Sequence, residues 1–131
     1  MLTGGCHCGA VRYEIPEAEV LHHAICHCGD CRRHAGAPAV GWAMLSATAL
    51  KVTGNPRIYC SSEHGRRAFC AECGTGLFYT NEQMLPGMVD VRSGTLDNPD
   101  ALPPGAEIQV AERLHWMRPL SDLPQFERYP G

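Results

Sequence analysis

With 131 residues, the chain is long enough for one domain with a modest core, and at this size metal sites add useful stability. Its formal net charge is −3, from 14 acidic and 11 basic residues, so we expect no strongly basic surface for nucleic acid or anionic membranes. No apolar run approaches the ~20 residues of a membrane helix, and the first residues lack the segments of a signal peptide. We therefore predict one cytoplasmic domain over residues 1–131 that binds neither nucleic acid nor membrane.

Short alternating or apolar segments follow one another along the chain. Residues 10–15 alternate, with Val11, Tyr13 and Ile15 on one face, and Pro16 ends the segment. Further strands are predicted at residues 20–25, 39–45, 49–52, 57–60, 66–69, 77–79, 88–91, 108–111 and 114–117, with a loop at 32–38. No segment keeps a 3.6-residue period beyond about two turns. The pattern predicts an all-β fold of coiled antiparallel sheets.

Seven of the eight cysteines fall into three short clusters, and Cys60 is solitary. The clusters are Cys6 with Cys8, Cys26 with Cys28 and Cys31, and Cys70 with Cys73. In a reducing compartment, such dense cysteines are typical of metal ligands rather than disulfides. A disulfide across a single intervening residue is strained, whereas two thiolates at that spacing can share one metal ion. The clusters therefore predict zinc.

The number of thiols allows two sites of different kinds. Structural zinc takes four protein ligands, and catalytic zinc takes three and keeps an open position. Two clusters must combine to make a four-thiolate site, and we favour Cys6, Cys8, Cys70 and Cys73. The three thiols Cys26, Cys28 and Cys31 could then hold a second ion by themselves, because they fall within six residues. The alternative is that Cys6 and Cys8 pair with Cys26 and Cys28. Thiolates alone also do not exclude iron.

The histidines and the solitary cysteine could complete the second site. His7 and His27 lie between ligands in their clusters, where we expect the side chain to point away from the metal. His34 and His64 fall in predicted loops and are candidate proton carriers or fourth ligands. Cys60 ends a predicted strand, so we expect a small buried side chain, with a place near the second site as the alternative.

In these motifs the chain resembles the glutathione-dependent formaldehyde-activating enzymes, a family whose domain also occurs in centromere protein V. The matching segments occur in order: residues 5–14 (GCHCGAVRYE), 26–33 (CHCGDCRR), 36–38 (GAP), 67–74 (RAFCAECG), and in the tail Trp116 with residues 123–126. At one position the chain departs from the pattern, since Glu107-Ile108 stands where many members carry His-Ile.

The resemblance implies a fold of coiled antiparallel sheets with zinc ribbons, similar to a small zinc-bearing chaperone of Rab GTPases (Mss-four-like). It also implies two zinc ions per chain. The structural ion would be held by Cys6, Cys8, Cys70 and Cys73, and the catalytic ion by Cys26, Cys28 and Cys31. This division agrees with the one favoured by spacing.

The implied activity is that of a carbon–sulfur lyase acting on a thiol–aldehyde adduct. The default pair is glutathione and formaldehyde, which give S-hydroxymethylglutathione. Arg32 and Arg33 directly follow the third cysteine of the loop, and we interpret them as holding carboxylates of a glutathione-like thiol, with His34 completing the substrate-binding set. The alternative is a non-catalytic zinc module that docks a protein partner.

Overall fold

The computed structural model describes residues 1–118 and 120–130, and β-strands make up most of its regular structure. The strands are β1 (Leu2–Gly5), β2 (Arg12–Ile15), β3 (His22–Cys26), β4 (Val40–Ser46), β5 (Lys51–Thr53), β6 (Arg57–Cys60), β7 (Gly65–Phe69), β8 (Gly76–Asn81), β9 (Met88–Arg92) and β10 (Ala106–Ile108). The described residues contain one α-helix, α1 (Gly29–Ala35). Short 3-10 turns lie at η1 (Glu17–Glu19), η2 (Ala47–Ala49), η3 (Ser93–Thr95), η4 (Pro99–Ala101), η5 (Val110–Glu112), η6 (His115–Met117) and η7 (Leu120–Asp122). The expectation of a predominantly β fold is confirmed.

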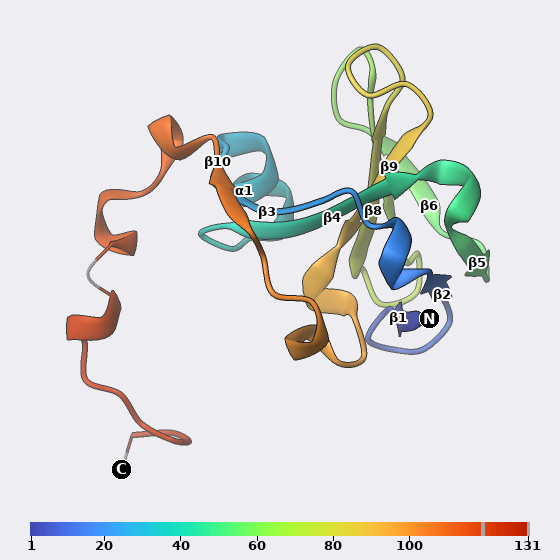
Figure 1. The fold of residues 1–131 in the computed structure, drawn as a ribbon. Helices are drawn as coiled ribbons and strands as arrows, with labels where there is room; N and C mark the ends of the chain where they lie inside the picture. The colour runs from blue at the N-terminus through green and yellow to red at the C-terminus, as the bar shows by residue number, and fades with distance from the viewer. Residues whose placement is uncertain (119, 131) are drawn as a thin grey trace.

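The strands form two sheets. The small sheet has the order β1-β2-β5, and the large sheet has the order β10-β3-β4-β9-β8-β7-β6. Neighbouring strands are antiparallel, except that β10 runs parallel to β3. Figure 1 shows that the large sheet twists strongly, so that β3 and β4 run in a clearly different direction from β8. The described residues after β10, orange to red in Figure 1, form no strand, and Met117 and Leu120 among them line a cavity with Ile25 of β3.

The main hydrophobic core joins the small sheet to the large sheet. It contains Cys6, Val11, Tyr13, Ile15, Leu45, Ala68, Cys70, Leu77, Phe78, Val89, Val91 and Leu96. The rings of Tyr13 and Phe78 meet edge to face, with centroids 5.4 Å apart. A second cluster consists of Cys26, Cys31, Val40 and Trp42. Both cores therefore include cysteines of the predicted metal sites.

The predicted loop at residues 32–38 is wrong over residues 32–35, because residues 29–35 form α1. The helix begins at Cys28, whose sulfur accepts a hydrogen bond from the Cys31 N–H at 3.3 Å. Asp30 lies in the first turn, and Gly36 ends the helix with φ +65° and an N–H bond to the carbonyl of Arg32. Two turns are too short for a periodic signal, and a cysteine cap is not among the usual start signals.

Most predicted strands are confirmed to within two residues, and the errors lie near the two ends of the chain. The predicted strand at 49–52 corresponds to β5, one to two residues later. β1 escaped prediction because its sequence, LTGG, gives a weak strand signal. The predicted strand at 108–111 is wrong beyond Ile108: Gln109 adopts φ +56°, which ends β10 and starts η5. The predicted strand at 114–117 is also wrong, since residues 115–117 form the 3-10 turn η6.

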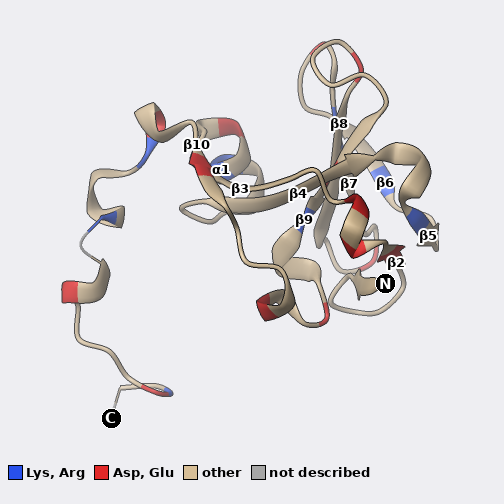
Figure 2. Ribbon diagram, viewed as in Figure 1, with Lys and Arg blue, Asp and Glu red and all other residues tan. Residues whose placement is uncertain are grey.

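Figure 2 shows acidic and basic residues interspersed along the ribbon. Among residues 1–118 and 120–130, no helix has the length and apolar character needed to cross a membrane.

A partly buried carboxyl on β9 makes the stability of the fold depend on pH. Burial raises the pKa of Asp90 to about 6, with His22 opposing the shift. Because this value exceeds the unfolded one of about 4, the carboxyl favours folding below pH ~4, and that contribution is lost as pH rises through about 6. Asp90→Asn is therefore expected to raise the free energy of unfolding by about 2 kcal/mol at pH 8, and by less at pH 5. Urea titrations of both proteins at the two pH values test this; equal stabilities throughout would contradict it.

Candidate metal centres and the adjoining pocket

The first metal centre candidate joins two turns that are far apart in the sequence. Cys6 and Cys8 follow β1, and Cys70 and Cys73 lie in the turn between β7 and β8. Their four sulfur atoms all lie within 4.8 Å of one another. The alternative pairing of Cys6 and Cys8 with cysteines of the central loop is not the arrangement in the structure. The four-sulfur group ties the start of the chain to the β7–β8 hairpin.

The distances within this four-sulfur group fit a tetrahedral metal ion. The sulfur of Cys8 lies 3.7 Å from that of Cys6 and 3.8 Å from that of Cys70. A tetrahedral zinc site with Zn–S bonds of about 2.3 Å places its sulfurs about 3.8 Å apart. A disulfide would bring two sulfurs to about 2.05 Å. The donor set is therefore compatible with zinc, and the cysteines are free thiols.

Hydrogen bonds lower the pKa of the Cys6 and Cys73 thiols. A backbone hydrogen bond from Ala10 also acts to lower the pKa of Cys8, but desolvation and the other three thiols outweigh it and raise that pKa to about 12. The N–H of Val11 donates to the Cys6 sulfur at 3.2 Å. Gly74 has φ +82°, which lets the chain reverse directly after Cys73, and its N–H bonds to the Cys70 carbonyl at 2.8 Å. The Thr75 hydroxyl lies 3.2 Å from the Cys73 sulfur and, with its own N–H, lowers the pKa of that thiol to about 5. Thr75 was not predicted, because nothing in the sequence marks a threonine two residues beyond a cysteine.

The second metal centre candidate lies where β3 leads into α1: Cys26 ends β3, Cys28 precedes α1, and Cys31 is in its first turn. The sulfurs of Cys26, Cys28 and Cys31 lie within 4.8 Å of one another, with Cys26 and Cys31 buried. Burial raises the pKa of Cys26 to about 12 and raises that of Cys31. These thiols therefore hold their protons until a cation displaces them.

The residues weighed as fourth ligands lie outside this three-sulfur group. Among the described residues, no histidine or carboxylate brings a ligand atom into the same cluster. His27 is 1% exposed and points to Glu107, with Nε2 2.8 Å from Oε1. The expectation of a buried Cys60 is wrong: Cys60 is exposed, because β6 is the outer strand of the large sheet and leaves both of its faces open.

Two arginines that the sequence did not single out lie near the three sulfurs. Arg67 on β7 is 5% exposed, and its two terminal nitrogens each lie 3.8 Å from the Cys31 sulfur. Its guanidinium stacks over the Tyr79 ring at 4.7 Å, and Arg92 on β9 stacks over Trp42 at 5.2 Å. Within the described residues, neither arginine forms a salt bridge. A buried cation without a carboxylate partner is costly, so this region favours an anion.

A polar cavity of about 360 Å³ adjoins the three-sulfur loop. It is lined by Asp30, Arg33, His34, Tyr59, Ser61 and Arg67. Of the three predicted substrate-binding residues, Arg33 and His34 line this polar cavity. Arg32 lines a neighbouring cavity with Arg33, Leu114 and Trp116 instead. Consecutive residues of a helix point in directions about 100° apart, which separates Arg32 from His34.

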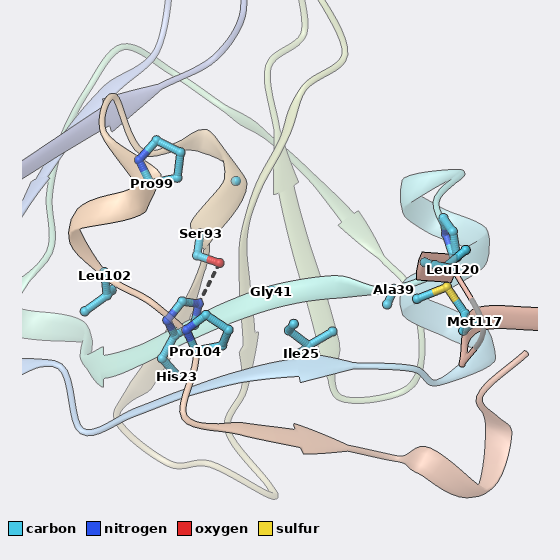
Figure 3. Close-up of a pocket in the computed structure, with 12 residues that line it drawn as sticks. His23, Ile25, Ala39, Gly41, Ser93, Pro99, Leu102, Pro104, Met117 and Leu120 are labelled. Atoms are coloured by element: carbon cyan, nitrogen blue, oxygen red, sulfur yellow. Dashed lines mark hydrogen bonds between the residues drawn. The ribbon is translucent and has the colours of Figure 1, made fainter. Parts of the chain in front are cut away.

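A larger cavity of about 430 Å³ lies on the opposite face of β3 and β4 (Figure 3). Side chains alternate along β3, so His23 and Ile25 face this cavity while Cys26 belongs to the cluster with Trp42. Figure 3 shows the cavity lined mainly by apolar side chains, with one hydrogen bond of 2.8 Å between His23 and Ser93. Neither cavity is lined by a cysteine, but Arg67 lines the polar cavity and also contacts the Cys31 sulfur at 3.8 Å. We therefore place the candidate functional site at the polar cavity despite the difference in volume.

Comparisons with known proteins show the family to which the chain belongs. Residues 1–112 match the family model described as glutathione-dependent formaldehyde-activating enzyme. A protein of Halomonas elongata named "Putative glutathione-dependent formaldehyde-activating enzyme" is 32% identical over 127 residues, covering 89% of this chain and 74% of that protein. An uncharacterized lyase of Schizosaccharomyces pombe is 33% identical over 81 residues, covering 60% of this chain and 58% of its own. The crystal structure of a Rhodobacter sphaeroides protein superimposes with a TM-score of 0.63 at 25% identity, over 80% of this chain and 98% of that one. From its match over residues 1–112, this chain belongs to the family of glutathione-dependent formaldehyde-activating enzymes.

Proposed function

We propose that the protein is a zinc-dependent carbon–sulfur lyase that forms or cleaves a thiol–aldehyde adduct, with glutathione and formaldehyde as the default pair. The catalytic ion would bind Cys26, Cys28 and Cys31, and a structural ion would bind Cys6, Cys8, Cys70 and Cys73. The observation that carries the proposal is a three-sulfur group beside a polar cavity lined by Arg33 and Arg67. Three ligands with an open fourth position are typical of catalytic zinc.

Zinc bound at this loop would stabilise a thiolate and polarise an oxygen atom of the substrate. The protein's own residues would bind and orient the thiol. Arg33 and Arg67 line the cavity with fixed positive charge and would hold a carboxylate of a glutathione-like thiol. In the forming direction, the sulfur lone pair makes the C–S bond, the carbonyl π pair moves to oxygen, and water supplies the proton. Cleavage reverses each of these changes.

The remaining proposals concern Arg32, the extent of the domain and the cellular compartment. Arg32, in the neighbouring cavity, would contact a more distant part of the same thiol. The fold would act as one domain over residues 1–131. A cytoplasmic location is supported by the free thiols, which a reducing compartment preserves.

One observation favours a second candidate function, a zinc module that docks a protein partner in the manner of the Rab chaperones. The C-terminal segment carries Trp116, Leu123 and Phe126, which are 56%, 58% and 57% exposed. Exposed aromatic and aliphatic side chains of this kind are common at protein interfaces. A protein that retains two zinc ions yet accelerates no thiol–aldehyde reaction would favour this function.

The lyase proposal is tested by exchange NMR spectroscopy between free glutathione and its formaldehyde adduct. The zinc-loaded protein is expected to accelerate the exchange above the rate in buffer. Glutathione and mercaptoethanol, a thiol without a carboxylate, are compared side by side. An exchange rate for glutathione equal to that in buffer would reject glutathione and formaldehyde as the substrates.

Arg33 gives a specific prediction for the same assay. Arg33→Ala is expected to raise KM for glutathione about tenfold, because it removes one charged hydrogen-bond partner of a carboxylate. The KM for mercaptoethanol should stay unchanged. Arg128→Ala, in the exposed C-terminal segment, is the matched control. Equal effects of Arg33→Ala on both thiols would contradict the carboxylate contact.

A further inference from the structure

We propose that His34 acts as a neutral imidazole whose Nε2–H donates a hydrogen bond to the oxygen of the thiol–aldehyde adduct. This role rests on the proposed lyase function. His34 is on α1, three residues after Cys31, and residues at that spacing are neighbours on one helix face. It also lines the polar cavity together with Arg67, which contacts the Cys31 sulfur.

The partner of Nδ1 shows that the hydrogen of the neutral His34 ring is on Nε2. Nδ1 of His34 lies 3.1 Å from Nη2 of Arg92. A guanidinium carries only donors and keeps its proton in proteins, so Arg92 must donate in this contact. Nδ1 must therefore present its lone pair. A neutral imidazole that accepts at Nδ1 carries its hydrogen on Nε2.

The charged groups around the His34 ring also favour the neutral imidazole. Arg92 on β9 and Arg67 on β7 are both cations, and Arg33 on α1 adds a third at the cavity wall. Asp30 also lines the cavity, but no carboxylate of the described residues lies within 4.0 Å of the imidazole. Burial, followed by Arg92 and Arg67, lowers the pKa of His34. A second proton on the ring would set two N–H groups against each other at Arg92.

The ring is also fixed in orientation. Tyr59 on β6 stacks on it, with centroids 6.0 Å apart and planes 7° from parallel. The Arg92 contact holds one edge of the imidazole, which leaves Nε2, on the other side of the ring, free of protein partners among the described residues. A hydrogen-bond donor held in place before the reaction stabilises developing charge without reorganising.

The step that this donor would assist is the transfer of electrons between sulfur and oxygen. During cleavage, water takes the hydroxyl proton of the adduct, an oxygen lone pair becomes the carbonyl π bond, and the C–S pair leaves with sulfur. Negative charge passes through the oxygen atom, where the Nε2–H bond stabilises it. The hydrogen stays on Nε2 throughout, so His34 is a donor and not a general base.

The hydrogen position is tested first, without any assay of activity. Long-range ¹H–¹⁵N correlation spectra of the zinc-loaded, histidine-labelled protein identify the His34 ring by its loss in His34→Gln. We expect an unprotonated Nδ1 and a protonated Nε2 at pH 7. A hydrogen on Nδ1, or a doubly protonated ring, would overturn the inference whether or not the protein is a lyase.

The role is tested by two replacements of different chemistry. His34→Phe keeps a flat ring against Tyr59 but has no donor, and we expect kcat to fall by a factor of about 10² with KM nearly unchanged. His34→Gln offers an amide N–H, and we expect it to recover at least about tenfold of that loss. His64→Gln, an exposed histidine outside the cavity, is the control. Equal losses in the Phe and Gln variants, or no loss in either, would overturn the donor role.

A wild-type protein without lyase activity would contradict the proposed function, and the NMR result separates that failure from a wrong tautomer.

Discussion

Cys73→Ser is expected to lower the free energy of unfolding by several kcal/mol and to remove one zinc ion per chain. Cys73 is an exposed side chain, and an exposed Cys-to-Ser change that breaks no special feature costs within about 0.5 kcal/mol. A larger loss must therefore come from the metal site. Structural zinc contributes its binding energy directly to folding, because the unfolded chain offers no preformed site.

Urea unfolding and metal analysis by mass spectrometry measure both effects on the same sample. Cys60→Ser is the matched control, because Cys60 is also exposed and lies outside both sulfur groups. The control should keep the wild-type stability and metal content. Wild-type stability in Cys73→Ser would contradict a structural ion at this position.

Cys28→Ser, unlike Cys73→Ser, is expected to retain the fold and most of its stability. We expect it to lower the activity by at least about 10²-fold. The sulfur of Cys28 both belongs to the three-sulfur group and caps α1 by accepting the Cys31 N–H. Serine is among the best helix-capping residues, so the replacement preserves the helix start while it removes a thiolate ligand. Removal of a ligand from a three-thiolate site should release the ion that supplies the chemistry.

The readouts are circular dichroism, zinc content and thiol–aldehyde exchange. Zinc should fall by one ion per chain while the folded spectrum and most of the stability remain. Cys60→Ser again serves as the control. Full activity in Cys28→Ser would contradict catalysis at this loop, and complete unfolding would show that the second site is structural instead.

The parts of the fold that follow from local patterns could be predicted. Residues 57–60 and 88–91 are short segments that contain β-branched or aromatic residues, and they were predicted to within one residue of β6 and β9. The errors have tertiary or unusual local causes. The cap that starts α1 is a cysteine, and the backbone that ends β10 turns at a non-glycine residue in the left-handed region, Gln109.

In the candidate site, too, features carried by local sequence could be predicted and features that depend on the tertiary structure could not. The cysteines could be singled out because short spacings such as Cys-x-Cys carry the signal within the sequence itself. Arg67 and Arg92 could not, because only the order of β7, β8 and β9 in the sheet brings them to the three-sulfur loop. The separation of Arg32 from Arg33 and His34 at the polar cavity depends on helical geometry that the sequence did not reveal.

The most direct test of the two-centre account is the metal stoichiometry of the purified protein, measured with and without excess glutathione. We predict two zinc ions per chain, both retained when glutathione is added, with X-ray absorption showing four sulfur neighbours at one ion. At the other ion it should show three sulfurs, rising to four with the thiol. A single ion per chain, or oxidised cysteine pairs in place of metal, would contradict the account.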